Sequence, residues 1–479
     1  MVRRTVIVAT ALFSPRAGFR WDVYGDKRLI IRGGTGLFTG RIPYVYLTNI
    51  PTNSGMYQYS ANVTNTSAGV SMNDFLFNPE PQAYNPFHNS ALQSKYPTYF
   101  PIKAGAAPST DFVVADPNYK FPQVWKTDFA FDQQIGKTWK VTVEALYTKD
   151  INATYMFDAN QKKPDATVTT GSYTRGYYSN AAARRLNSVI SGNAIVLASS
   201  SKGSSFVFTT QLEKSFVKGL SGSIAYTYTY AANITENPGS QASSVWSANN
   251  TANTLNDLEL AYANFAVPHR VVGYVAYRYE YIQHLATTVS LIYEGAANGA
   301  YSYVYNGSVN NQGLNSANLM YIPTDATNPS EILFKNNVVY TSGTYTAAQQ
   351  AQIFENYIKQ DPYLSKHRGQ VAGRNGAKRS WYNRLDMKFL QDIFTKVGPR
   401  RHTIQFSADI YNLANLINHD WGARKIYTIN NPLKVESVTN GVPTFSITSY
   451  NGAPVSKTFI NTISTSSTWS MQLGIRYIF

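Results

Sequence analysis

The 479-residue sequence contains no cysteine, which excludes disulfides, thiolate metal sites and cysteine nucleophiles together. It also has no apolar run near the roughly 18 residues that a membrane-spanning helix needs. Charged residues make up only 14% of the chain, whereas about 25% is usual in soluble domains. Mean hydropathy is still slightly negative, at −0.27. Neutral polar residues and 36 tyrosines therefore replace the missing charges.

The charge that is present is mostly positive, giving a formal net charge of +15. A strongly basic chain can indicate nucleic-acid binding. Here, however, lysine and arginine are spread through predicted turns and strands and form no basic arm. We therefore expect no nucleic-acid partner. A basic surface fits anionic lipid head groups, lipopolysaccharide or an anionic solute equally well.

Catalytic and metal-binding motifs are also missing. The six histidines form no i, i+4 pair and have no acidic partner at ligand spacing. The glycines between Gly34 and Gly40 resemble a phosphate loop, but no helix follows them to supply a row of amides. We predict no catalytic residue, no metal, no cofactor and no enzymatic activity.

The clearest positive signal is the final strand, where apolar and polar residues alternate with a period of two. Such a strand lies between an apolar phase and water, either in a soluble sandwich or in a membrane β-barrel. Ending on an aromatic residue favours the barrel, in which aromatic side chains lie at the membrane interface. The apolar face of this strand comprises Trp469, Met471, Leu473, Ile475, Tyr477 and Phe479.

The same alternation recurs along the chain and predicts about eleven long strands. Turns of about four residues alternate with connections of about 30 to 75 residues, as in outer-membrane barrels with short periplasmic turns and long extracellular loops. A soluble sandwich would need structureless loops of implausible length. We therefore predict an all-β, antiparallel transmembrane barrel in the cell outer membrane. The two longest predicted loops are 42–118 and 308–379.

Charged residues on the polar faces of these strands are expected to line a wet lumen, because Lys or Arg facing lipid at mid-membrane costs about 2–4 kcal/mol. They are the candidate ligand-binding residues. They are Arg16, Arg20, Arg32, Lys140, Glu144, Arg278 and Glu280.

Two further segments carry local signals. Thr346 and Gln349 form a capping box that predicts a short helix within the second long loop. Residues 1–10 combine two arginines with a short apolar stretch, like a signal peptide, but no clear cleavage site follows. We expect residues 1–10 to be a truncated start and 11–479 to form one barrel domain.

Several motifs carry a family resemblance. They are 13–19 with 21–23, the glycine-rich 32–41, 363–369 with 374–376, and 409–413 with Asn418, Trp421 and Gly422. This combination resembles the Oar-like, SusC-related branch of TonB-dependent outer-membrane receptors. Gly373 departs from the pattern, where an acidic residue is expected, and this substitution would weaken a local ion pair.

The resemblance implies a complete receptor with 22 strands, a plug inside the barrel and a segment that recruits TonB. The eleven strands here would be its C-terminal half, without the plug, so that TonB would act only through the missing region. The last strand would be the signal read by the barrel-assembly machinery, and a surface lipoprotein would be a further partner.

These observations favour TonB-dependent uptake of a bulky solute, with the ligand bound by the long loops. A surface adhesin or structural barrel, and a passive porin, are the alternatives. The sequence does not identify the ligand.

Overall fold

The computed structural model describes residues 11–53, 63–64, 67, 69–80, 82–85, 88–97, 99–100, 111–180, 182–188, 190, 192–313 and 318–479. The predicted truncated start, 1–10, lies outside these residues.

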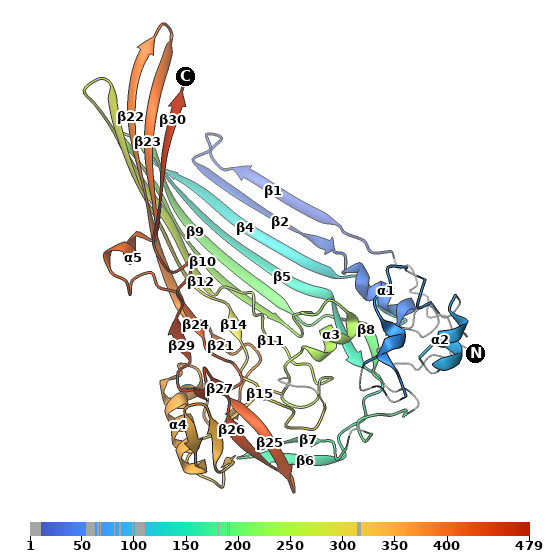
Figure 1. Cartoon of the computed structure of the whole chain (residues 1–479). Helices are drawn as coiled ribbons and strands as arrows, with labels where there is room; N and C mark the ends of the chain where they lie inside the picture. Colours follow the sequence, from blue (N-terminus) through green and yellow to red (C-terminus); the bar gives the residue numbers. More distant parts are fainter. Residues whose placement is uncertain are drawn as a thin grey trace.

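One large antiparallel sheet dominates the molecule (Figure 1). Eleven long strands follow one another across it in chain order, and each pairs with the next. They are β1 (Arg16–Asp22), β2 (Leu29–Thr39), β4 (Gln123–Ile135), β5 (Trp139–Asp158), β9 (Ser204–Val217), β10 (Leu220–Asn233), β12 (His269–Tyr281), β13 (Leu285–Ala297), β22 (Trp381–Val397), β23 (Arg400–Tyr411) and β30 (Ser470–Ile478). The sheet is curved and open, with β1 and β30 as its two outer strands.

The predicted strand number and loop rhythm are confirmed. Tight turns join β1 to β2, β4 to β5, β9 to β10, β12 to β13 and β22 to β23 at one end of the sheet, and long connections join the strands at the other. The β9–β10 turn uses Lys218 and Gly219 at φ 50° and 84°. Positive φ is the geometry of tight hairpins, and it suits glycine because glycine has no Cβ. The two ends are called the turn end and the cap end below.

One predicted strand is wrong. The alternation between Asn193 and Phe216 predicts one long strand, but the structure has two, β8 (Ala194–Ser200) and β9, separated at Gly203. Gly203 adopts φ 127°, a conformation that L side chains rarely take. Here β8 leaves the main run and pairs with the end of β5 and, in parallel, with β3 (Phe112–Ala115).

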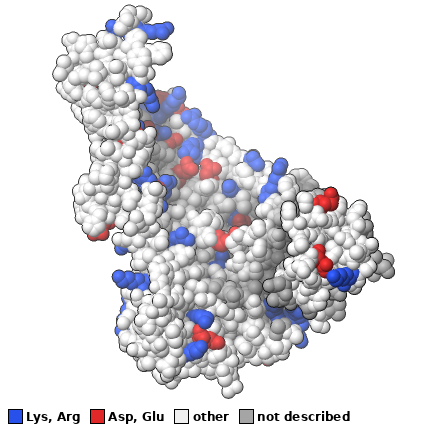
Figure 2. All heavy atoms as spheres, in the orientation of Figure 1, with Lys and Arg blue, Asp and Glu red and all other residues white. Residues whose placement is uncertain are grey.

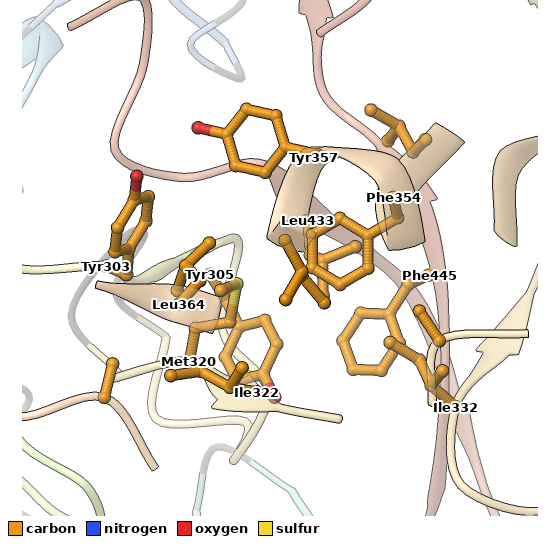
Figure 3. Close-up of a cluster of buried hydrophobic side chains, with 14 of the residues drawn as sticks. Tyr303, Tyr305, Met320, Ile322, Ile332, Phe354, Tyr357, Leu364, Leu433 and Phe445 are labelled. Atoms are coloured by element: carbon orange, nitrogen blue, oxygen red, sulfur yellow. The ribbon is translucent and has the colours of Figure 1, made fainter. Parts of the chain in front are cut away.

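The connections fold into a cap with its own core (Figures 1 and 3). Parts of three connections supply 21 buried residues to the largest cluster, including Tyr303, Tyr305, Phe354, Leu433 and Phe445. Tyr305 and Phe445 stack with ring centroids 5.1 Å apart. This core explains how such long connections can fold, because their apolar side chains are buried against one another.

Small sheets tie these connections together. β15 (Tyr305–Asn306), β25 (Leu433–Thr439), β26 (Val442–Ile447) and β17 (Leu333–Phe334) form one four-stranded sheet. The remaining pairs are β6 (Ala166–Thr170) with β7 (Tyr173–Tyr177), β14 (Ala300–Tyr301) with β21 (Ala377–Lys378), β16 (Tyr321–Ile322) with β20 (Gln370–Val371), β18 (Val338–Tyr340) with β19 (Gly343–Tyr345), β24 (Lys425–Tyr427) with β29 (Phe459–Asn461), and β27 (Ser449–Tyr450) with β28 (Ala453–Pro454); β11 (Ala261–Tyr262) pairs with β10.

Short helices complete the cap. They are α1 (Tyr44–Thr52), α2 (Ser90–Lys95), α3 (Ala242–Ser247), α4 (Ala347–Gln360) and the 3-10 turns η1 (Met72–Phe75) and η2 (Leu364–Lys366). A further short helix, α5 (Leu413–Ile417), lies beside β22 and not in the cap. The predicted capping box is confirmed at α4, where Thr346 Oγ1 accepts from the Gln349 amide and the Gln349 side chain accepts from the Thr346 amide. Among the described residues, no helix is long and apolar enough to cross a membrane.

Candidate functional site along the inner face

The two faces of the sheet differ in chemistry. Cα partners in an antiparallel pair lie on the same face, so the register assigns each residue to a side. Arg32, Ala130 and Glu144 are successive partners on one face, and Ile31, Phe131 and Val143 are successive partners on the other. Figure 2 shows charged side chains gathered in the hollow of the sheet. The concave, inner face is therefore the polar one.

Ion pairs cover this inner face. On β2, β4 and β5, Arg32 Nη2 lies 2.7 Å from Glu144 Oε2, and Arg32 Nε lies 3.4 Å from Asp132 Oδ2. Lys140 Nζ lies 3.6 Å from Asp132 Oδ1. Three of the candidate residues thus meet around Asp132, which is not among the site residues predicted from the sequence.

A second group lies near the turn end of β12, β22 and β23. Arg278 Nη1 lies 2.8 Å from Asp392 Oδ2, and Arg278 Nη2 lies 3.0 Å from Glu280 Oε1. Arg401 reaches Glu280 at 3.3 Å, and Gln405 donates to Asp392 Oδ1 at 2.8 Å. The predicted pair Arg278 and Glu280 is brought together, but Asp392 and Arg401 were missed. Both lie on the inner face with the other charged residues of β22 and β23, but nothing in the sequence indicates that β22 lies two strands from β12.

The last two candidates, Arg16 and Arg20, are in no ion pair with any described residue. The Arg16 guanidinium lies over the Phe38 ring, 4.4 Å from its centroid, and Lys126 approaches the same ring at 5.7 Å. Arg20 is exposed and is the register partner of Arg32. These residues leave the β1 side of the inner face basic.

Further ion pairs extend the inner face toward the cap end. They are Arg270 with Glu294, Arg384 with Asp386, and Lys388 with Asp409, at 2.8, 2.8 and 2.9 Å. Fixed charges of both signs thus run along most of the hollow, a surface that holds water and solvates a polar solute.

A recess of about 440 Å³ opens at the cap end of this face, between β5, β9, β10 and the connections above them. Asp150, Asn152, Asn233 and Glu236 are among its lining residues. The half-buried Asp150 carboxylate has no hydrogen bond or ion pair with any described residue. The recess therefore contains an acceptor group that a bound solute can use.

Glu236 fixes the roof of the recess. Arg374 Nη1 lies 3.5 Å from Glu236 Oε1, and Asn375 Nδ2 donates to the same oxygen at 2.9 Å. Arg374 also donates to the carbonyl and side-chain oxygens of Asn233 on β10. Burial lowers the pKa of Arg374, against the opposing effect of Glu236. Arg374 and Asn375 belong to the second long connection. Their hydrogen bonds to Asn233 and Glu236 thus hold the cap against the sheet. Gly373, beside them, donates its amide to Tyr363 Oη at 2.8 Å.

The outer face is apolar and carries aromatic side chains near both ends. Tyr147, Phe206 and Tyr230 are successive register partners near the cap end. With them on the outer face are Trp125 and Trp381, and toward the turn end Trp21, Trp139, Phe216, Tyr277, Tyr279 and Tyr477, all exposed. Two aromatic belts flanking an apolar band are typical of a sheet that crosses a membrane.

The last strand fits this band. Its outward residues Met471, Leu473, Ile475 and Tyr477 are 51–74% exposed and continue the apolar surface of β23. Trp469, just before the strand, and the terminal Phe479 are 44% and 75% exposed. The Tyr477 and Phe479 rings stack with centroids 5.6 Å apart at the turn end.

An apolar outer band, a charge-lined hollow and long cap loops together define an outer-membrane β-barrel protein. Residues 2–449 match the model of the outer membrane beta barrel domain family. The chain belongs to that family and resides in the cell outer membrane. Proteins of this kind are typically not enzymes, and the described residues contain no cluster of His, Asp and Glu that could hold a metal ion.

Among solved structures, the chain is similar to the outer membrane transporter YddB from Escherichia coli, with a TM-score of 0.37 and 12% identity. The match covers 90% of this chain and 39% of that one, so the chain spans well under half of the transporter's length. None of the curated proteins compared with the sequence matches it.

Proposed function

We propose that the chain is the C-terminal half of the barrel of a TonB-dependent receptor that imports a bulky solute across the outer membrane. The observation that carries this proposal is the set of charged side chains that lines most of the inner face, between the recess beneath the cap and the turn end. A polar solute entering at the cap meets charged side chains along most of its path, while the outer face remains apolar.

In this proposal the cap binds the solute first. The recess at Asp150 and the inner-face residues Arg16, Arg20, Arg32, Lys140, Glu144, Arg278 and Glu280 line its path. The rest of a 22-strand barrel, with a plug and a TonB-recruiting segment, would pair with β1 and β30. The barrel-assembly machinery would read β30 during insertion, and a surface lipoprotein would help to retain the solute.

Energy dependence distinguishes this proposal from a passive porin. We expect cells producing the complete receptor to accumulate its solute, and an uncoupler or loss of TonB to abolish this accumulation. A porin would continue to pass solute under both conditions. A plug-coding sequence in the reading frame directly upstream of Met1 would support the receptor. A verified absence of such a sequence would overturn it.

The folded cap favours one alternative, a surface adhesin or structural barrel that binds a partner without transport. Its buried core holds the connections in one arrangement, which a binding surface requires. In that case the Asp150→Asn variant would leave partner binding unchanged, and no solute would accumulate in cells producing the wild type.

A further inference from the structure

An apolar surface protrudes from the connection between β23 and β30. It consists of Leu416, Ile417, Trp421 and Ile463, whose exposed fractions are 43%, 67%, 54% and 94%. These four residues are called the apolar flank. Residues 413–418 carry no charge, so no charged side chain from this segment covers Leu416 or Ile417. Large apolar side chains clustered on a surface mark a contact with another molecule or with lipid.

The flank lies on the outer side of the sheet. β22 pairs with β13 from Trp381 onward but with β23 only from Met387. Residues 381–386 of β22 therefore extend beyond the part paired with β23 at the cap end. α5 contacts β22 and follows directly after β23. In Figure 1, α5 lies beside the wall formed by β22, β23 and β30, on the side away from the charge-lined hollow of Figure 2.

Hydrogen bonds hold the flank in place. Asn412, at φ 56°, donates its side-chain amide to the carbonyls of Gly422 and Ser467, at 3.2 and 2.8 Å. The Trp469 amide donates to Asn415 Oδ1 at 3.2 Å. Pairing of β24 with β29 links the same two segments again. The flank is therefore a fixed part of the wall at the start of β30.

The lipid-facing surface continues into the flank. Trp381, Trp469 and Met471 are exposed on the outer face at the same end of β22 and β30. Trp381 and Trp469 belong to the aromatic belt at the cap end, the level at which amphipathic side chains meet the membrane interface. A short segment with a charge-free apolar side and the polar His419 and Asp420 at its far end suits that layer.

We propose that the apolar flank is inserted into the extracellular leaflet, with lipid acyl chains covering Leu416, Ile417, Trp421 and Ile463. The flank would then fix the depth of the barrel beside the last strand. This proposal rests on the outer-membrane location and not on the transport function, so loss of transport would leave it standing.

The absence of cysteine allows a direct test, because one introduced cysteine accepts one nitroxide label. The variants Ile417→Cys and Ile463→Cys are labelled in outer-membrane vesicles that contain the full chain. The lipid control is Leu473→Cys on the outer face of β30, and the water control is Val339→Cys, which is 77% exposed on the cap. The measurement is the collision rate of each label with oxygen and with a water-soluble nickel complex.

We expect labels at Ile417 and Ile463 to behave like the Leu473 label, with collisions with nickel several-fold lower than at Val339 and collisions with oxygen higher. Nickel collisions equal to those at Val339 would show that the flank lies in water and would overturn the proposal. Low rates with both reagents would show that a protein covers the flank, which also overturns it. Leu416→Cys carries the same test if either variant fails to assemble.

Discussion

Arg278 on β12 and Asp392 on β22 form their 2.8 Å ion pair diagonally across β13, where Arg278 is the register partner of Thr288 and Asp392 that of Ala286. Ala286 is fully buried and is the register partner of both Glu280 and Asp392. Ala130 is likewise fully buried, and its two register partners, Arg32 and Glu144, form an ion pair across it. A small residue on the middle strand thus allows long charged side chains from its two neighbours to meet.

Enlarging that middle residue should separate the pair. We expect Ala286→Leu to lower the free energy of unfolding by about 2 kcal/mol, because added methylene groups must displace packed neighbours. Urea titration of the purified protein in detergent measures this change. The control is Ala276→Leu, a half-buried inner-face alanine on β12 that lies beneath none of the ion pairs described above. An equal loss in the control would show that the effect does not depend on the ion pair.

Removing the Asp392 charge should leave Arg278 partly unpaired. The Asp392 side chain is 6% exposed, and removing one partner of a well-buried pair is strongly destabilising. Because Arg278 keeps Glu280 and some solvent, we expect Asp392→Asn to cost about 2 kcal/mol. A double-mutant cycle with Arg278→Gln isolates the pair, and additive effects of the two substitutions would rule out coupling between them.

The two faces of β30 should respond differently to the same added charge. Leu473 faces outward and is 70% exposed to the apolar phase, whereas Gln472 is the register partner of the inner-face residue Asp409. We expect Leu473→Lys to cost about 2–4 kcal/mol and to reduce the assembled fraction, because a lysine would face lipid. Gln472→Lys should leave assembly near that of the wild type. Comparable yields of the two variants, judged by heat-modifiable mobility on gels, would contradict the assignment of the faces.

Glu436 on β25 should make the cap sensitive to acid. Burial alone would raise the pKa of Glu436, but hydrogen bonds with Lys434, Ser446 and Lys335 lower it from 4.5 to about 2. A lowered pKa means that the stability contributed by this carboxylate is fully present above about pH 4.5 and is lost as the pH falls toward 2.

Pepsin cleavage of the β25–β26 hairpin, followed between pH 5 and about 2, measures this loss. We expect the wild type to become steadily more susceptible over that range. Glu436→Gln should be susceptible throughout, and its cleavage should depend less on pH. Glu259→Gln, at an exposed carboxylate, is the control. Identical pH profiles for wild type and Glu436→Gln would refute the prediction.

The strand framework was predictable because each signal was local. Alternation around Leu473, and turn glycines such as Gly136 and Gly219, identify strands and hairpins from neighbouring residues alone. The capping box at Thr346 is equally local and was confirmed. The break at Gly203 was missed because nothing in the sequence shows that β8 pairs away from the main run, with β5 and β3.

The site was only half predictable for the same reason. Alternation placed Arg278 and Glu280 on the polar face, but their partners Asp392 and Arg401 lie more than a hundred residues away. The recess at Asp150 depends on three separate connections meeting, and the cap depends on apolar residues scattered from Val168 to Val455. Tertiary pairing of this kind leaves no periodic trace in the sequence.

The odd number of long strands has a consequence for closure. With eleven antiparallel strands, β1 and β30 both run from the cap end to the turn end. Joined directly, whether within one sheet or between two copies, they would form a parallel seam in an otherwise antiparallel wall. To pair antiparallel with both β1 and β30, the added strands beside them must run from the turn end to the cap end. An alternating set that begins and ends in that direction contains an odd number of strands. Strand parity alone thus limits what can complete this wall.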